Sequence, residues 1–135
     1  MPKSFFAVLC DDVREEMRGK VSLMGIFSQF MVSDFSKPLP RFRLFAKIGF
    51  ESAGNHPFTI RLRSGEGQNI FEFSGTANVR DEDEVTNLYM ANINIGFDNL
   101  KLPRPGLYEL VFFYQQQAFH IVPLQAVLVK PPTLQ

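Results

Sequence analysis

The stretch PRPGLYELVFFYQQQAFHIV, residues 103–122, decides the fold of this chain. Two prolines and a glycine at its start disfavour a helix, and the run Leu107–Tyr114 that follows is aromatic, β-branched or leucine except for Glu109. A second apolar run begins at Phe119. The stretch therefore predicts a β-hairpin, and we place its two-residue turn at Gln116–Gln117.

Outward from this hairpin, apolar and polar residues alternate in Phe42–Phe50 and again in Tyr89–Phe97. Such alternation is typical of strands with one buried face. Shorter apolar runs occur at 4–10, 20–32, 58–63, 70–79 and 124–130, and we expect 20–32 to form one strand bent at Gly25. Only 12–19 suggests a helix, of a single turn from Asp12 to Gly19. We expect a core that includes Phe42, Leu44, Ile48, Phe58, Ile60, Ile93, Ile95, Leu110 and Phe112.

These runs predict an all-β protein, an antiparallel sandwich of two sheets with about seven to eight strands that ends at Pro131–Pro132. A length of 135 residues favours a single domain, residues 1–135. The 14 Lys and Arg balance the 14 Asp and Glu, so net charge indicates no anionic partner. Cys10 is the only cysteine, which favours a reducing cytoplasm, and no run is long enough to cross a membrane.

Few residues indicate chemistry. Asp11 and Asp12, with two glutamates after them, could offer oxygen ligands to a divalent cation, although their spacing fits no calcium loop. Cys10 lies in an apolar run, where a thiol is usually inert, so a nucleophilic pair with His56 or His120 is not favoured. We therefore expect neither a cofactor nor an enzyme, and a small hydrolytic or metal-dependent enzyme is the alternative.

A basic strand face is a second candidate site. Arg41, Arg43 and Lys47 share the polar face of one predicted strand, and Arg61 and Arg63 that of the next. If these two strands pair, five cations form one patch that could bind an anionic ligand or nucleic acid. The zero net charge and the local glutamates argue against nucleic acid.

The two faces of the predicted hairpin are both largely apolar, although a two-sheet sandwich buries only one. With the turn at Gln116–Gln117, we expect Leu107, Val111, Phe113, His120 and Val122 to share the outer face. That face must be covered by a loop, by the N-terminal segment or by another molecule. A second copy is the simplest cover, which predicts a homodimer.

Two features carry a resemblance to known proteins. Tyr108, two residues after Gly106, resembles the tyrosine corner of immunoglobulin-like sandwiches, in which the buried hydroxyl bonds to backbone a few residues upstream. Residues 7–14 (AVLCDDVR), 19–20 (GK), 25–27 (GIF), 102–103 (LP) and 105–108 (PGLY) together resemble a family of small uncharacterised bacterial proteins, a domain of unknown function. The resemblance implies an immunoglobulin-like β-sandwich, and it carries over no activity and no catalytic residue.

The sequence thus predicts a non-enzymatic binding or assembly module that acts through contacts with itself or with another protein. No motif in it identifies the partner.

Overall fold

The computed structural model describes residues 1–130, which form ten β-strands, one 3₁₀ turn at Met17–Gly19 and no α-helix. The strands are β1 (Lys3–Cys10), β2 (Asp12–Glu15), β3 (Val21–Met24), β4 (Gln29–Val32), β5 (Phe42–Phe50), β6 (Gly54–Ser64), β7 (Asn69–Val79), β8 (Tyr89–Phe97), β9 (Gly106–Tyr114) and β10 (Gln117–Leu128). Within residues 1–130, no helix is long and apolar enough to span a membrane.

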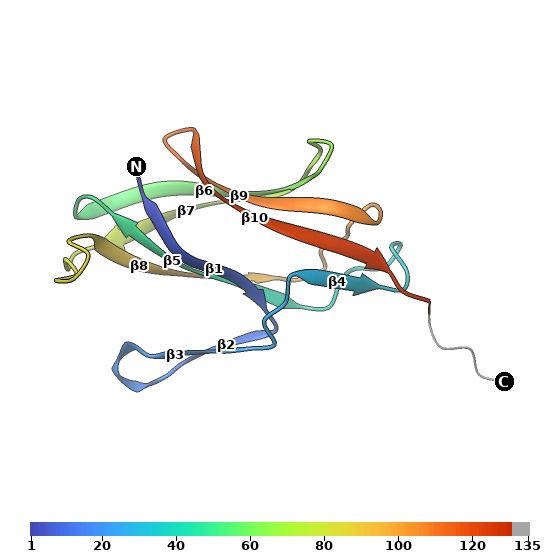
Figure 1. Ribbon diagram of the computed structural model, residues 1–135, viewed down its shortest axis with the longest axis horizontal. Helices are drawn as coiled ribbons and strands as arrows, with labels where there is room; N and C mark the ends of the chain where they lie inside the picture. Colours follow the sequence, from blue (N-terminus) through green and yellow to red (C-terminus); the bar gives the residue numbers. More distant parts are fainter. Residues whose placement is uncertain (131–135) are drawn as a thin grey trace.

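The strands form two packed sheets and a separate two-stranded arm (Figure 1). The small sheet has the order β1-β5-β8, and the large sheet has the order β4-β10-β9-β6-β7. All pairs are antiparallel except β4 and β10, which run parallel. The arm is the hairpin β2–β3, which extends away from the small sheet on the side opposite the large one.

The core lies between the two sheets and is a single cluster of buried side chains. All nine predicted core residues are buried, because each occupies an inward position of an alternating strand. Aromatic rings fill much of the space, and Phe42 stacks on Phe97 of the neighbouring strand with 4.7 Å between ring centroids. Burial of this apolar surface is the main term that stabilises the fold.

The structure confirms the all-β class but not the immunoglobulin-like arrangement of two sheets. There are ten strands rather than seven or eight, one pair is parallel, and the large sheet is strongly curled (Figure 1). The predicted end of the fold at Pro131–Pro132 lies outside the described residues.

The N-terminal third also differs from the prediction. The expected helical turn at Asp12 is wrong, because 12–15 pairs with 21–24 as the β2–β3 arm, and only Met17–Gly19 turns helically. The run 20–32 is two strands rather than one bent strand. Gly25 separates them with φ +69°, and a side chain there would collide with the carboxylate of Asp11.

The β9–β10 hairpin is present, but its predicted register is wrong. Gln115 and Gln116 form the turn with φ of +50° and +67°, and a β-bulge at Phe119 lets Phe112 face His120 instead of Ile121. A shift of one residue moves every later side chain of β10 to the other face. His120 therefore turns towards the core and Ile121 turns outward.

The bond predicted for Tyr108 is present. Its hydroxyl donates to the carbonyl oxygen of Arg104 at 2.5 Å and accepts from the backbone N–H of the same residue at 3.3 Å. Only 1% of Tyr108 is exposed, so the bond fixes the loop before β9 against the core.

Candidate functional site: two open strand edges

The free edge of β8 is the most unusual feature of the sheets. β8 is the last strand of the small sheet and pairs with β5 over nine residues without a bulge. Its sequence, YMANINIGF, contains no charged residue and no proline. Among residues 1–130, only Glu82 pairs with the free side of β8, in a single bridge to Tyr89, so the edge from Met90 to Phe97 keeps unpaired backbone donors and acceptors.

Edge strands are normally protected from pairing with other chains by charges, prolines, bulges or short length. The other free edge of the small sheet, β1, begins with Lys3 and contains a bulge between Ser4 and Phe6. β4, at one end of the large sheet, has only four residues. β8 has none of these protections, and the edge is therefore competent to accept another strand.

β7, the last strand of the large sheet, lies beside β8 without hydrogen bonding to it (Figure 1). A groove of about 430 Å³ separates them. It is lined by residues between Phe73 and Asn78 of β7, by Met90–Ile95 of β8 and by Phe58 behind them. The inward side chains of Phe73 and Ala91, and Gly75 on the same face of β7, stay partly exposed here, so the core is incompletely closed along this seam between β7 and β8.

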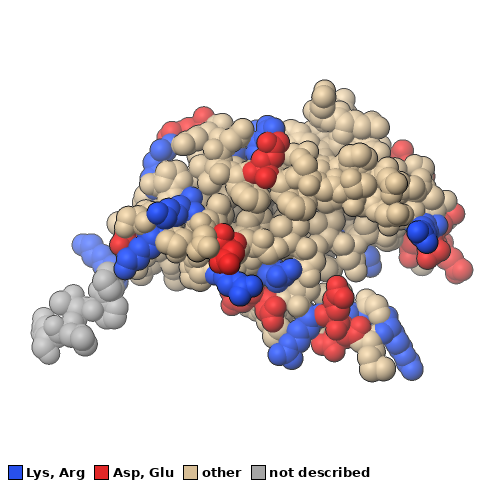
Figure 2. Space-filling model, turned by 180° about the vertical axis from the view of Figure 1, so that it is seen from behind, with Lys and Arg blue, Asp and Glu red and all other residues tan. Residues whose placement is uncertain are grey.

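The seam is also uncharged. The described residues that line the groove include no Asp, Glu, Lys or Arg. Figure 2 views the molecule from the side on which β7 and β8 are outermost, and it shows a broad area over these strands without acidic or basic side chains. Charged side chains elsewhere on this view are mixed in sign. An uncharged strand would meet no desolvated charge in this groove.

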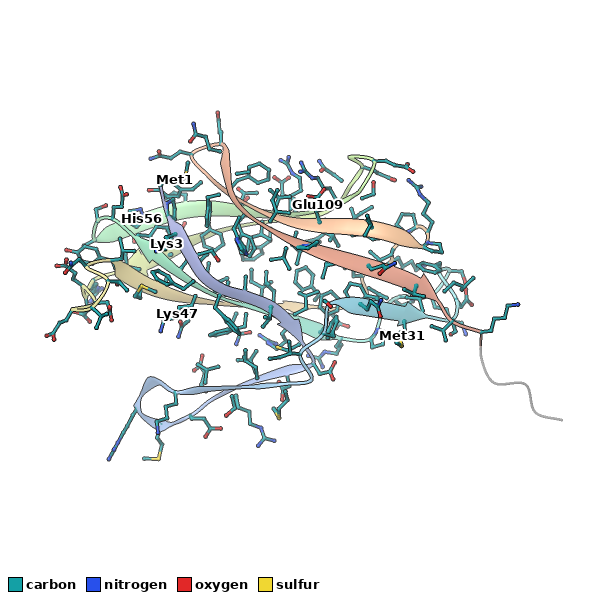
Figure 3. All side chains as sticks on the ribbon, viewed as in Figure 1. Met1, Lys3, Met31, Lys47, His56 and Glu109 are labelled. Atoms are coloured by element: carbon teal, nitrogen blue, oxygen red, sulfur yellow. The ribbon has the colours of Figure 1, made fainter. Side chains whose placement is uncertain are left out.

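The predicted basic face does not form as one patch, because β5 and β6 lie in different sheets. Lys47 of β5 and Glu109, the ion-pair partner of Arg63, lie on opposite sides of the molecule (Figure 3). Arg43 donates to the side-chain oxygen of Asn94 at 2.7 Å, and Arg41 is exposed just before β5. The five cations are thus divided between two surfaces.

Arg61, the remaining cation, borders a hollow of about 620 Å³ on the outer face of the large sheet. Its Nη2 donates to Glu72 at 3.1 Å, and its guanidinium lies 5.0 Å from the ring centroid of Phe113. Thr59 and Ser74 line the same hollow, with 3.2 Å between their hydroxyl oxygens. The ion pair neutralises the charge of Arg61, so this hollow offers an anion little attraction.

The five residues predicted for the hairpin interface do not share a face. Leu107, Val111 and Phe113 point outward from β9, whereas the bulge turns His120 and Val122 inward, opposite Phe112 and Leu110. Leu107 is 65% exposed, but Val111 has no exposed surface between its cross-strand neighbours on β6 and β10. The outer face of β9 is therefore partly covered within the chain itself.

The chemical candidates are also dispersed. Among residues 1–130, no three His, Cys, Asp or Glu side chains come together as they would around a metal ion. Burial raises the pKa of the Cys10 thiol, and Asp11 raises it further. Both ring nitrogens of His56 already have partners, the hydroxyl of Tyr114 and the carbonyl oxygen of Ser52.

Comparison with known protein families gives one match. Residues 5–127 match the model of a family described as "Family of unknown function (DUF6941)". The chain belongs to this family. The match spans both sheets and the β2–β3 arm, so the open seam lies within the family domain. It confirms the predicted relationship to a domain of unknown function, while the bacterial origin of the family stays a prediction. No curated protein matches the chain.

Proposed function

We propose that this protein is a non-enzymatic binding or assembly module that acts through protein–protein contacts, by adding an extended segment of a partner to the free edge of β8. The observation that carries the proposal is the long, regular and uncharged edge of that strand. In strand addition, backbone hydrogen bonds supply affinity and alternate side chains supply specificity.

The groove beside β8 supports the same function. A strand paired with β8 would direct alternate side chains towards Phe73, Gly75 and Ala91, which are incompletely buried in the free protein. Apolar side chains there would remove this surface from water, at roughly 25 cal/mol for each Å² buried. The partner segment is therefore extended, uncharged on its inward side, and about six to eight residues long, the number that spans the free edge at roughly 3.4 Å per residue.

A bacterial cytoplasm is the proposed location. The buried, single Cys10 and the resemblance to small bacterial proteins support it.

Selection from a library of displayed random eight-residue peptides tests the proposed function. The protein is immobilised sparsely, so that each molecule is isolated from other copies. We expect enrichment of uncharged peptides rich in β-forming residues, because these pair with β8 without burying a charge.

The matched variants are Asn92→Lys, which places a charge on the free edge, and Leu107→Lys, which places one on an exposed position of the large sheet. Peptides selected on the wild type should bind Asn92→Lys at least tenfold more weakly and Leu107→Lys unchanged. A library that yields no enriched peptide, or peptides that tolerate Asn92→Lys and not Leu107→Lys, would contradict binding at β8.

A further inference from the structure

The sequence of β8 is nearly symmetric about its central residue. Aromatic residues stand four positions either side of Ile93, aliphatic residues two positions either side, and asparagines, Asn92 and Asn94, directly beside it. Met90 and Gly96 are the one dissimilar pair. A strand with this pattern presents the same order of side chains when it is read in either direction.

From this symmetry and the free edge, we propose that the partner at β8 is a second copy of this chain, paired antiparallel about a two-fold axis through Ile93. The inference rests on the proposed strand addition and names its partner. In this pairing Asn92 of each copy faces Asn94 of the other, and Ala91 faces Ile95. A two-fold axis uses one edge twice, which gives a closed dimer and leaves no free β8 edge.

The faces of the two small sheets match in this register. Asn92 and Asn94 lie on the exposed face of β8, whereas Ala91, Ile93 and Ile95 lie on the core side. Pairing about Ile93 places exposed residues beside exposed residues and core-side residues beside core-side residues. The two small sheets would then form one continuous sheet of six strands.

The asparagines also suit one another chemically. The Oδ1 atom of Asn94 accepts from Nε of Arg43 at 2.7 Å, which leaves its amide NH₂ group to donate to Asn92 of the second copy. Two-fold symmetry makes this contact twice. The two β8 strands bring no charge of their own into the interface, since β8 contains none, and the nearest cation, Arg43, is the one that binds Asn94.

This dimer differs from one formed through the outer face of the hairpin. Val111 has no exposed surface and Phe113 is covered in part by Arg61, so the large apolar side chains that this face exposes are mainly those of Leu107 and Ile121. The β8 edge is free over eight residues, from Met90 to Phe97.

Sedimentation equilibrium of the wild type from 1 to 100 µM tests the association. We expect a reversible dimer whose dissociation constant rises at least tenfold in Asn92→Lys and is unchanged in Leu107→Lys. A wild type that is monomeric at 100 µM overturns the second copy as partner. So does a dimer that Leu107→Lys disrupts and Asn92→Lys does not.

Disulfide formation tests the register. When Asn92→Cys protein is mixed with Asn94→Cys protein under mild oxidation, the two should cross-link to each other much faster than either variant does alone, because residues 92 and 94 face each other across the axis. Equal rates in the mixture and in the separate variants overturn the pairing about Ile93.

The peptide selection separates this inference from the function on which it rests. Enriched peptides with a monomeric wild type refute the second copy and keep strand addition to another protein. If the library yields no enriched peptide and the wild type is also monomeric, both proposals are refuted.

Discussion

His56 and Tyr114 are joined by a contact of 2.7 Å between Nδ1 and the phenolic oxygen, which ties the start of β6 to the end of β9. Nε2 of the same imidazole lies 2.7 Å from the carbonyl oxygen of Ser52. Because a carbonyl oxygen only accepts, Nε2 carries the hydrogen, and Nδ1 accepts from the tyrosine hydroxyl. His56 is buried and stacks on Phe50 with 4.5 Å between ring centroids.

Loss of the Tyr114 hydroxyl should therefore lower stability. In Tyr114→Phe the ring remains, but Nδ1 of His56 loses its donor, which costs about 1–2 kcal/mol of unfolding free energy. Urea unfolding measures the change. Tyr89→Phe is the control, because the Tyr89 hydroxyl makes no hydrogen bond within residues 1–130, and an equal loss in both variants would contradict the expectation.

Tyr108→Phe should destabilise the fold by about 0.5–1.5 kcal/mol, because it removes the hydrogen bond from the buried Tyr108 hydroxyl to the carbonyl oxygen of Arg104. The phenyl ring keeps its place in the core, so the change isolates the hydroxyl. Thermal unfolding followed by circular dichroism should show a lower melting temperature with an unchanged native spectrum. A melting temperature equal to that of the wild type would mean that the bond contributes nothing net.

The Gln115–Gln116 turn should be open to stabilisation. Both residues have left-handed backbone conformations, in which a non-glycine residue costs roughly 1–2 kcal/mol. Asn-Gly is the pair best suited to a two-residue hairpin turn of this kind. We expect Gln115→Asn/Gln116→Gly to raise the unfolding free energy by about 1 kcal/mol in urea titrations. Gln117→Asn, just outside the turn, should give no gain.

His120 should make stability depend on pH near neutrality. Burial lowers its pKa in the folded protein, so between that pKa and about 6.5 the unfolded chain binds the extra proton. The stabilisation is complete above about pH 6.5 and is lost as the pH falls through the folded pKa. The urea midpoint of the wild type should fall more between pH 7.5 and 5.5 than that of His120→Gln.

Asp34 and Asp83 do not contribute to this pH dependence. Hydrogen bonds from Ser36 and Thr86 lower the pKa values of Asp34 and Asp83, so these carboxylates titrate below their ordinary value of about 3.9. Identical midpoint shifts in the wild type and His120→Gln would assign the pH dependence to another group.

Much of the local structure could be predicted from the sequence. The alternation in 42–50 and 89–97 predicted two strands with the observed bounds, because the period of a strand decides which side chains one face buries. The nine core residues and the Tyr108 bond followed from the same kind of local pattern. The sequence predicted that the candidate edge residues Asn92, Ile93 and Asn94 belong to a strand with one polar face. It did not predict that this strand lies at the edge of a sheet.

The tertiary structure alone decided which strands are neighbours. β5 and β6 are consecutive in the chain but belong to different sheets, which divided the predicted basic patch. β4 and β10 pair although they are far apart in sequence, and one bulge at Phe119 reversed the orientation of His120 and Val122. The open edge of β8 likewise exists only because no other strand of the chain pairs beside it within the described residues. The physical reason is that side-chain periodicity is set by each strand's own backbone, whereas pairing depends on hydrogen bonds between distant segments, whose choice is made by the packing of the whole chain.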